Sequence, residues 1–269
     1  MYMKALAAFP FLWVVAFLIG DTLLQGSPSH ATFIRVEIEL AKALNLLGAW
    51  AAAISFDRGD YLRRAWLLIG ACMALLLLRD LTIVPGVAAA LGASYVVAVR
   101  GLLVVAANAS QVVGTWLLAR AWQRASLALP GSHASQWGVR IGAIALAVAF
   151  AGPGVVSGLG RFAEGDWAAL AGAASALGDM ISLCLIAPLL LTALALRGGL
   201  FGWPFWLLTT SYVAWLVYDA VLVLGPAVGL GSAAVLMASE AFRGLGSTLG
   251  ASAGFAQREV VRSVRRPQV

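Results

Sequence analysis

The stretch WLLIGACMALLLL, residues 66–78, is apolar along its whole length. A strand of a membrane barrel alternates apolar and polar residues over about 10 positions, so an unbroken apolar run indicates a helix instead. A helix needs about 20 such residues to cross a bilayer, and the flanking sequence extends this run over 65–83. The stretch therefore predicts a transmembrane helix.

Similar runs occupy most of the chain. Of its 269 residues, 62% are hydrophobic and 11% are charged, whereas a soluble domain has about 45–50% and about 25%. The first run is long enough to span a membrane and no small-residue cleavage site follows it, so we expect a retained helix rather than a signal peptide. The sequence predicts an all-α polytopic membrane helix bundle of about eight transmembrane helices, near 5–24, 36–56, 65–83, 92–119, 140–160, 167–196, 203–223 and 228–256.

Basic residues favour one side of the predicted bundle. With a cytoplasmic N-terminus, twelve Lys and Arg residues fall in inner segments, whereas outer segments hold only Arg35 and Arg161. Cytoplasmic loops of membrane proteins carry such an excess. We therefore expect a multi-pass protein of a bacterial-type inner membrane with both termini cytoplasmic and with loops 25–33 and 161–166 outside. The twelve inner residues are Lys4, Arg58, Arg63, Arg64, Arg120, Arg124, Arg140, Arg197, Arg258, Arg262, Arg265 and Arg266.

The chain also suggests an internal duplication. An offset of about 140 residues lays ALLLLRDLTIVPGVAAALG over VAWLVYDAVLVLGPAVGLG and pairs Asp80 with Asp219. Two copies of four helices would be related by a pseudo-two-fold axis along the membrane normal. The alternative is that a high content of Ala, Gly and Leu lets any two such segments align. We expect one transmembrane domain over 1–256, with repeat halves 1–124 and 137–256, and a short basic cytoplasmic tail at 257–269.

Eleven charged residues fall within the predicted spans, nearly all in their outer halves. Each costs at least about 2.5–3.5 kcal/mol near the bilayer centre, so these side chains should face one another or water. Glu240 and Arg243 are spaced i, i+3, which places them on one helix face. The pattern predicts an outward-facing charged vestibule lined by the second, third, fourth, sixth, seventh and eighth helices. Its expected ligand-binding residues are Glu39, Asp80, Arg100, Asp179, Asp219, Glu240 and Arg243.

A structural interpretation of the same charges stays open, because ion pairs within a membrane bundle can simply fix the helix register. Trp215 and Tyr218 lie beside Asp219 on the seventh predicted helix. They would either stack on a ligand or pack between helices.

Several kinds of function are disfavoured by the sequence. His30 and His133 are predicted on opposite sides of the membrane, which excludes a shared catalytic or haem site for them. Cys72 and Cys184 lie in apolar runs, and no His or Cys cluster has zinc-ligand spacing. The basic residues are distributed by membrane side rather than on a soluble face. We therefore expect no enzymatic activity, no cofactor, no metal and no nucleic-acid partner.

Residues 178–225 resemble the multi-helix membrane-embedded input regions that precede kinase or diguanylate cyclase outputs in some bacterial signalling proteins. Such regions open an apolar helix with Gly-Asp or Leu-Asp, continue through a short Arg-containing inner loop, and end a Trp-rich helix in Asp. The matching positions are Gly178, Asp179, Arg197, Trp203, Trp206 and Asp219. The resemblance implies a sensory role. AGFAQREVVRSVRRPQV, 253–269, is similar to the start of a helix leading to an output domain, and no such domain follows in this sequence.

Together these features predict a non-enzymatic integral membrane protein, a sensor-like or ligand- or partner-binding helix bundle. Its expected partners are the lipid bilayer, a small ligand or lipid headgroup, and a membrane or signalling protein. The alternative is a small secondary transporter whose two halves rock around intramembrane carboxylates and arginines.

Overall fold

The computed structural model describes residues 2–120, 130–166, 168–226 and 228–265. Within these ranges the chain is all-helical, with eight long helices and one short helix. Seven of the long helices are long and apolar enough to cross a membrane, and α10 is not among them. The long helices are α1 (Tyr2–Leu24), α2 (His30–Ser55), α3 (Tyr61–Leu81), α5 (Ala93–Ala119), α7 (His133–Ala163), α8 (Ala168–Ala195), α9 (Gly202–Leu224) and α10 (Ser232–Arg265).

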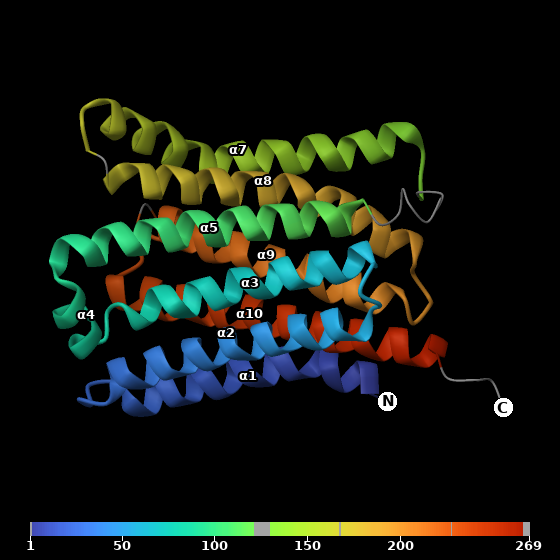
Figure 1. The fold of residues 1–269 in the computed structure, drawn as a ribbon, viewed down its shortest axis with the longest axis horizontal. Coiled ribbons are helices and arrows are strands. Elements are labelled where there is room, and N and C mark those ends of the chain that lie inside the picture. Colours follow the sequence, from blue (N-terminus) through green and yellow to red (C-terminus); the bar gives the residue numbers. More distant parts are fainter. Residues whose placement is uncertain (1, 121–129, 167, 227, 266–269) are drawn as a thin grey trace.

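The long helices run up and down in one bundle, and both ends of the chain lie at the same end of it (Figure 1). We call this the terminal end, and it also holds the connections at 56–60 and 196–201. The opposite loop end holds the connections at 25–29, 82–92 and 225–231. All ten described residues of the predicted inner basic set lie toward the terminal end, while Arg124 and Arg266 lie outside the described residues.

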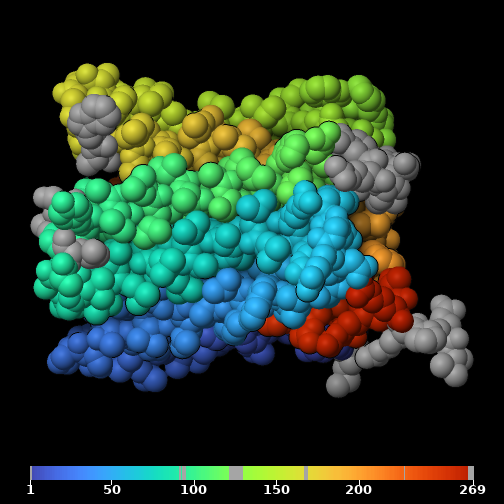
Figure 2. Space-filling model, viewed as in Figure 1, coloured from blue at the N-terminus to red at the C-terminus, as the bar shows by residue number. Residues whose placement is uncertain are grey.

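Six helices form a closed ring. Each of α2, α3, α5, α8, α9 and α10 packs against the next, and α10 returns to α2. In Figure 2, α3 lies between α2 and α5 along one face of this ring. Helices α1 and α7 lie outside the ring, with α1 against α10 and α7 against α8. A four-plus-four repeat would make α1 equivalent to α7 and α5 equivalent to α10, so that contact of α1 with α10 would be matched by contact of α7 with α5. The main contact of α7 is with α8 instead, and the repeat stays a prediction.

The polarity of α10 follows from its position. Its buried side is built from small residues, among them Gly244, Ser247, Gly250, Ala253 and Gly254. Small residues let helix backbones approach closely within membranes. Helix α10 packs against α1, α2 and α9, so much of its surface faces protein rather than lipid. This explains why α10 is less apolar than the other long helices, and the count of eight spans remains a prediction.

Several predicted boundaries were wrong. Residues 84–91, which lie between the predicted helices 65–83 and 92–119, include the seven-residue helix α4 (Pro85–Leu91), with Pro85 in the first turn, where its missing N–H costs nothing. Helices α2 and α7 begin at His30 and His133, before the predicted starts at 36 and 140. Helix α10 continues to Arg265, well beyond the predicted end at 256. Gln257 and Val260 are buried within the bundle. Residues 257–265 therefore continue the helix, with 257–261 packed at least in part against the bundle and 262–265 exposed.

The main apolar core fills the terminal half of the bundle. Trp66, Leu118, Leu189 and Leu249 are at most 2% exposed and belong to a single cluster that joins the ring helices there. The interior charges lie in the other half, toward the loop end. The inside of the ring is thus divided into an apolar terminal half and a polar loop half.

Candidate functional site

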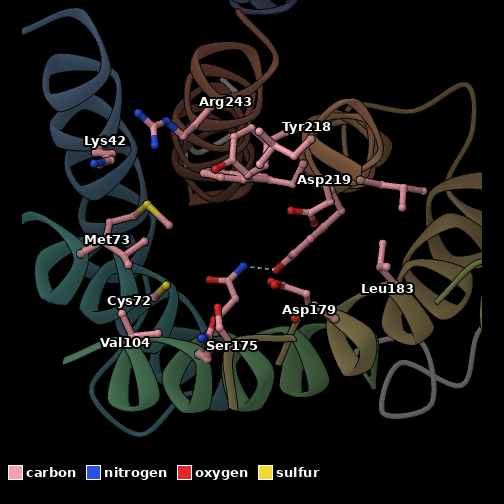
Figure 3. A pocket seen from close by; sticks show the side chains of 18 of the residues that line it. Lys42, Cys72, Met73, Val104, Ser175, Asp179, Leu183, Tyr218, Asp219 and Arg243 are labelled. Carbon is pink, nitrogen blue, oxygen red and sulfur yellow. Dashed lines mark hydrogen bonds between the residues drawn. The ribbon is translucent and has the colours of Figure 1, made fainter. Parts of the chain in front are cut away.

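A cavity of about 280 Å³ lies inside the loop half of the ring. All six ring helices contribute side chains to its wall, and these are the six helices that the sequence predicts around a vestibule. Lys42 and Arg243 lie on one side of the space, and Asp179 and Asp219 lie on the other (Figure 3). The wall combines these charges with aromatic, hydroxyl, amide and apolar groups.

The α2 and α3 wall holds a compact network of ion pairs. Lys42 is only 2% exposed, and its Nζ donates to Glu39 Oε1 at 2.8 Å and also to Asp80. Arg79 donates two hydrogen bonds to the same Asp80 carboxylate, from Nε at 2.7 Å and from a terminal nitrogen at 2.9 Å. Two cations therefore share two carboxylates, and the charges of this wall are neutralised.

A second ion pair lies on α10. A terminal nitrogen of Arg243 is 2.5 Å from Glu240 Oε2, and the guanidinium carbon lies 5.9 Å from the ring centre of Tyr218 on α9. This bears out the prediction that Arg243 meets a carboxylate. Glu37 on α2 is also buried and accepts a hydrogen bond from the indole N–H of Trp13 on α1.

The opposite wall differs, because its carboxylates have no partner. Asp179 on α8 and Asp219 on α9 both line the cavity and lie on the same side of it (Figure 3). Within the described residues neither carboxylate forms a hydrogen bond or an ion pair. Each lining cation thus has a carboxylate, whereas these two carboxylates have no cation.

Two further acceptors face the cavity without a donor. Gln111 donates its Nε2 to the Tyr212 hydroxyl at 2.5 Å, which leaves its buried Oε1 without a partner. Ser182, one helical turn after Asp179, lines the cavity and is 9% exposed, and its hydroxyl has no hydrogen bond among the described residues. A buried amide oxygen without a donor, such as Gln111 Oε1, calls for an explanation.

Tyr212 closes the cavity toward the terminal end. It is 5% exposed, belongs to the apolar core, and hydrogen-bonds through its hydroxyl to Thr115 as well as Gln111. These bonds join α9 to α5 across the ring. On the terminal side of these bonds the interior is filled by the apolar core, so the cavity ends at the Tyr212 layer.

The structure brings together six of the seven residues predicted for the site. Asp179, Asp219 and Arg243 line the cavity. Glu39, Asp80 and Glu240 lie directly behind the wall as the ion-pair partners of its cations. Arg100 on α5 is not among the lining residues, and it forms no ion pair within the part of the chain that the structure describes.

Several lining residues were missed. Lys42 and Arg79 were recognised as intramembrane charges but were not assigned to the site, although their positions on the second and third predicted helices matched those of Glu39 and Asp80. Gln111 and Tyr212 carried no comparable signal, because uncharged polar residues are common within helices. Whether each of them lines the cavity depends on which face of its own helix points into the ring.

The two histidines of the described chain do not share a site. His30 pairs with Asp21 at 2.7 Å near the loop end, whereas His133 begins α7 at the terminal end. The two histidines therefore lie at opposite ends of the bundle, as the sequence predicts. Among the described residues no group of three or more His, Cys, Asp or Glu side chains could hold a metal ion.

Comparisons with protein-family models, with curated proteins and with solved structures give no match.

Proposed function

We propose that this protein is a membrane-embedded receptor that binds a small polar ligand in the six-helix cavity without converting it. The observation that carries the proposal is a polar cavity walled by all six ring helices and closed toward the terminal end by the Tyr212 layer and the apolar core. Ligand pockets are typically concave, partly apolar and supplied with a few convergent polar groups. This cavity combines apolar side chains with a few polar groups in the same way.

A purely structural role would use every charge in an ion pair, since an uncompensated charge in a membrane interior is expensive. The cavity cations meet this expectation, because Lys42, Arg79 and Arg243 are all paired. Glu37 on α2 lies outside the cavity wall and has the Trp13 indole as its hydrogen-bond donor instead of a cation. Asp179 and Asp219 do not meet the expectation. Unpaired carboxylates in a cavity are better explained by a ligand that compensates them than by helix register alone.

The proposed orientation places the loop end outside the cell and both termini in the cytoplasm. Its support is the concentration of Lys and Arg at the terminal end, together with the general cytoplasmic excess of these residues. The ligand would then enter from the outside, and the membrane would be a bacterial inner membrane.

Helix α10 provides a route from the cavity to a signalling partner. It carries Glu240 and Arg243 beside the cavity and continues through the core to Arg265 at the terminal end. A ligand that changes the Arg243 contacts would act on a single continuous helix. The resemblance of 178–225 and of 253–269 to bacterial sensory input regions supports the same direction, with a membrane or signalling protein as the partner.

A second candidate is a small secondary transporter. One observation favours it: α2, α3 and α5 form one side of the ring and α8, α9 and α10 form the other, so the cavity lies between two groups of three helices. Alternating access would require the Tyr212 layer and the core below it to open. Solute uptake by proteoliposomes distinguishes the two candidates, because a receptor binds its ligand without accumulating solute.

Labelling of introduced cysteines tests the receptor proposal. In a Cys72→Ser, Cys184→Ser background, a Ser175→Cys variant places a thiol in the cavity wall. We expect an impermeant thiol reagent to modify it from outside intact cells. Leu189→Cys, a fully buried position further along the same helix, is the matched control and should stay unmodified. Equal protection of both thiols would contradict an externally accessible cavity.

A further inference from the structure

We infer that the ligand is a small organic ammonium ion whose charged nitrogen lies between Asp179 and Asp219. This inference rests on the proposed ligand-binding function and names the chemical class of the ligand. Four independent features of the wall support it: its charge, its hydrogen-bonding groups, its apolar surface and its size.

The charge of the wall favours a cation. Lys42 and Arg79 share the carboxylates of Glu39 and Asp80, and Arg243 is paired with Glu240. An anionic ligand would have to compete with these existing partners. A cation meets two carboxylates that have no partner in the described structure, so it gains attraction without breaking an ion pair.

The hydrogen-bonding groups favour a ligand that donates. Gln111 Oε1 is a buried acceptor with no donor, because the amide nitrogen is already bonded to Tyr212. The Ser182 hydroxyl, 9% exposed, is also without a partner and can accept or donate. The buried Nε of Arg243 is a donor without a partner. The four carboxylate oxygens of Asp179 and Asp219 together with Gln111 Oε1 outnumber it, so acceptors are in excess. An ammonium group carries donors and no acceptor, so it complements this excess.

The rest of the wall favours an organic ion over a bare metal ion. Calcium takes 6–8 oxygen ligands and magnesium needs near-octahedral geometry. This wall includes Met73, Val104 and Leu183, and its aromatic pair Trp215 and Tyr218 packs edge to face at 5.5 Å. Apolar and aromatic side chains suit the hydrocarbon body of a ligand, and aromatic faces also attract ammonium groups.

The volume limits the ligand to a small molecule. At about 280 Å³ the cavity is near the lower end of the range of about 300–1,000 Å³ that is usual for small-molecule pockets. The cavity is too small to enclose a whole lipid or a peptide. A compact amine with a short apolar body fits.

The test measures the charge preference of the cavity with two thiol reagents of opposite charge. The Ser175→Cys protein, in the background without Cys72 and Cys184, is placed in lipid nanodiscs so that both ends are accessible. It is treated with aminoethyl methanethiosulfonate, which is a primary ammonium ion, or with its anionic sulfonatoethyl counterpart. The ratio of the two rates is divided by the same ratio for a Ser27→Cys variant at the loop end, which corrects for intrinsic reactivity.

We expect the corrected ratio to favour the ammonium reagent by about tenfold or more. The paired charges of the wall cancel and the two unpaired carboxylates leave it net negative, and a cleft with an excess of one sign of charge concentrates counter-ions by about tenfold or more. Replacing both acids, Asp179→Asn with Asp219→Asn, should remove the preference. Glu164→Gln, which removes an exposed carboxylate at the loop end, should leave it unchanged. If the double variant does not fold, the corrected ratio of labelling rates measured on the protein with both acids intact still tests the inference.

The outcomes separate the two proposals. A corrected ratio near one, or one that favours the anion, would overturn the ammonium inference while leaving an accessible cavity in place. Failure of both reagents to reach the Ser175→Cys thiol would overturn the proposed ligand-binding function itself.

Discussion

A β-carbon built on Gly254 of α10 would lie 2.2 Å from the carbonyl oxygen of Gly48 on α2. The two helices therefore cross with their backbones in direct contact at this point. The contact is reciprocal, since a β-carbon on Gly48 would lie 2.4 Å from the carbonyl oxygen of Ala251. Neither position can accept a side chain unless the helices separate.

The first prediction concerns this crossing. Gly254→Ala should lower the free energy of unfolding by about 1–3 kcal/mol, the usual cost of overpacking a tight interior. Gly142→Ala on α7 is the matched control, because no atom lies within 4 Å of its added β-carbon. In a helix that change is neutral or stabilising by about 0.5–1 kcal/mol. Unfolding in mixed detergent micelles measures both, and similar values for the two variants would contradict the crossing.

The second prediction concerns the ion pair on α10. Arg243→Ala leaves the Glu240 carboxylate without its cation, and loss of one partner of a buried pair costs about 3–5 kcal/mol, less where water enters. Arg262→Ala removes an exposed arginine from the same helix and should have little effect. Thermal unfolding in detergent compares the two variants. Equal melting temperatures would show that Arg243 is not held in a buried network.

The third prediction follows from the same pair. Combining Glu240→Gln with Arg243→Gln removes both charges, so neither is left uncompensated. The double variant should therefore recover part of the stability that Arg243→Ala loses. A double variant less stable than Arg243→Ala would show that the pair contributes through contacts other than its mutual charge.

The fourth prediction concerns Lys42, the most deeply buried cation of the wall. Lys42→Met keeps the length of the side chain but leaves Glu39 without its cation and Asp80 with Arg79 alone. We expect a loss of about 3 kcal/mol or more, as for other broken buried pairs. Lys4→Met, at an exposed position of α1, is the control and should change little. Chemical unfolding in nanodiscs measures the free energy of unfolding of both variants. Equal values for the two would contradict the ion-pair network.

The fifth prediction concerns topology. In the background without native cysteines, Ser27→Cys lies at the loop end and Ser132→Cys at the terminal end. An impermeant reagent added to intact cells should modify the first thiol and spare the second, because the basic terminal end is expected in the cytoplasm. The reverse labelling would move the cavity to the cytoplasmic side.

The sequence predicted the helical class from its long apolar runs, and it predicted the helices around the cavity because charges are rare enough in such a chain for their positions to carry information. Asp179, Asp219 and Arg243 were recognised on this basis, and all three line the cavity. Arg100 shows the limit of the argument, because a charge within a helix does not by itself reveal which neighbour it faces.

Other features depend on packing that no local pattern reports. The unpaired state of Asp179 and Asp219 follows from where six helices place their cations. The packing of α10 beyond residue 256 was not expected, because its mixed composition is typical of a solvated segment, whereas Gln257 and Val260 are covered by neighbouring helices. The small residues of α10 do not by themselves identify α2 as the helix they pack against.

The composition of α10 also has a consequence for biosynthesis. A segment that carries Glu240 and Arg243 among small residues partitions poorly into lipid on its own, since each charge is costly there. Its partners α1, α2 and α9 all precede it in the chain. The ribosome therefore delivers α10 only after the surfaces that cover it already exist. Stable insertion of this helix therefore requires that its partner helices are already in place. In an incomplete bundle its charges would stay in contact with lipid.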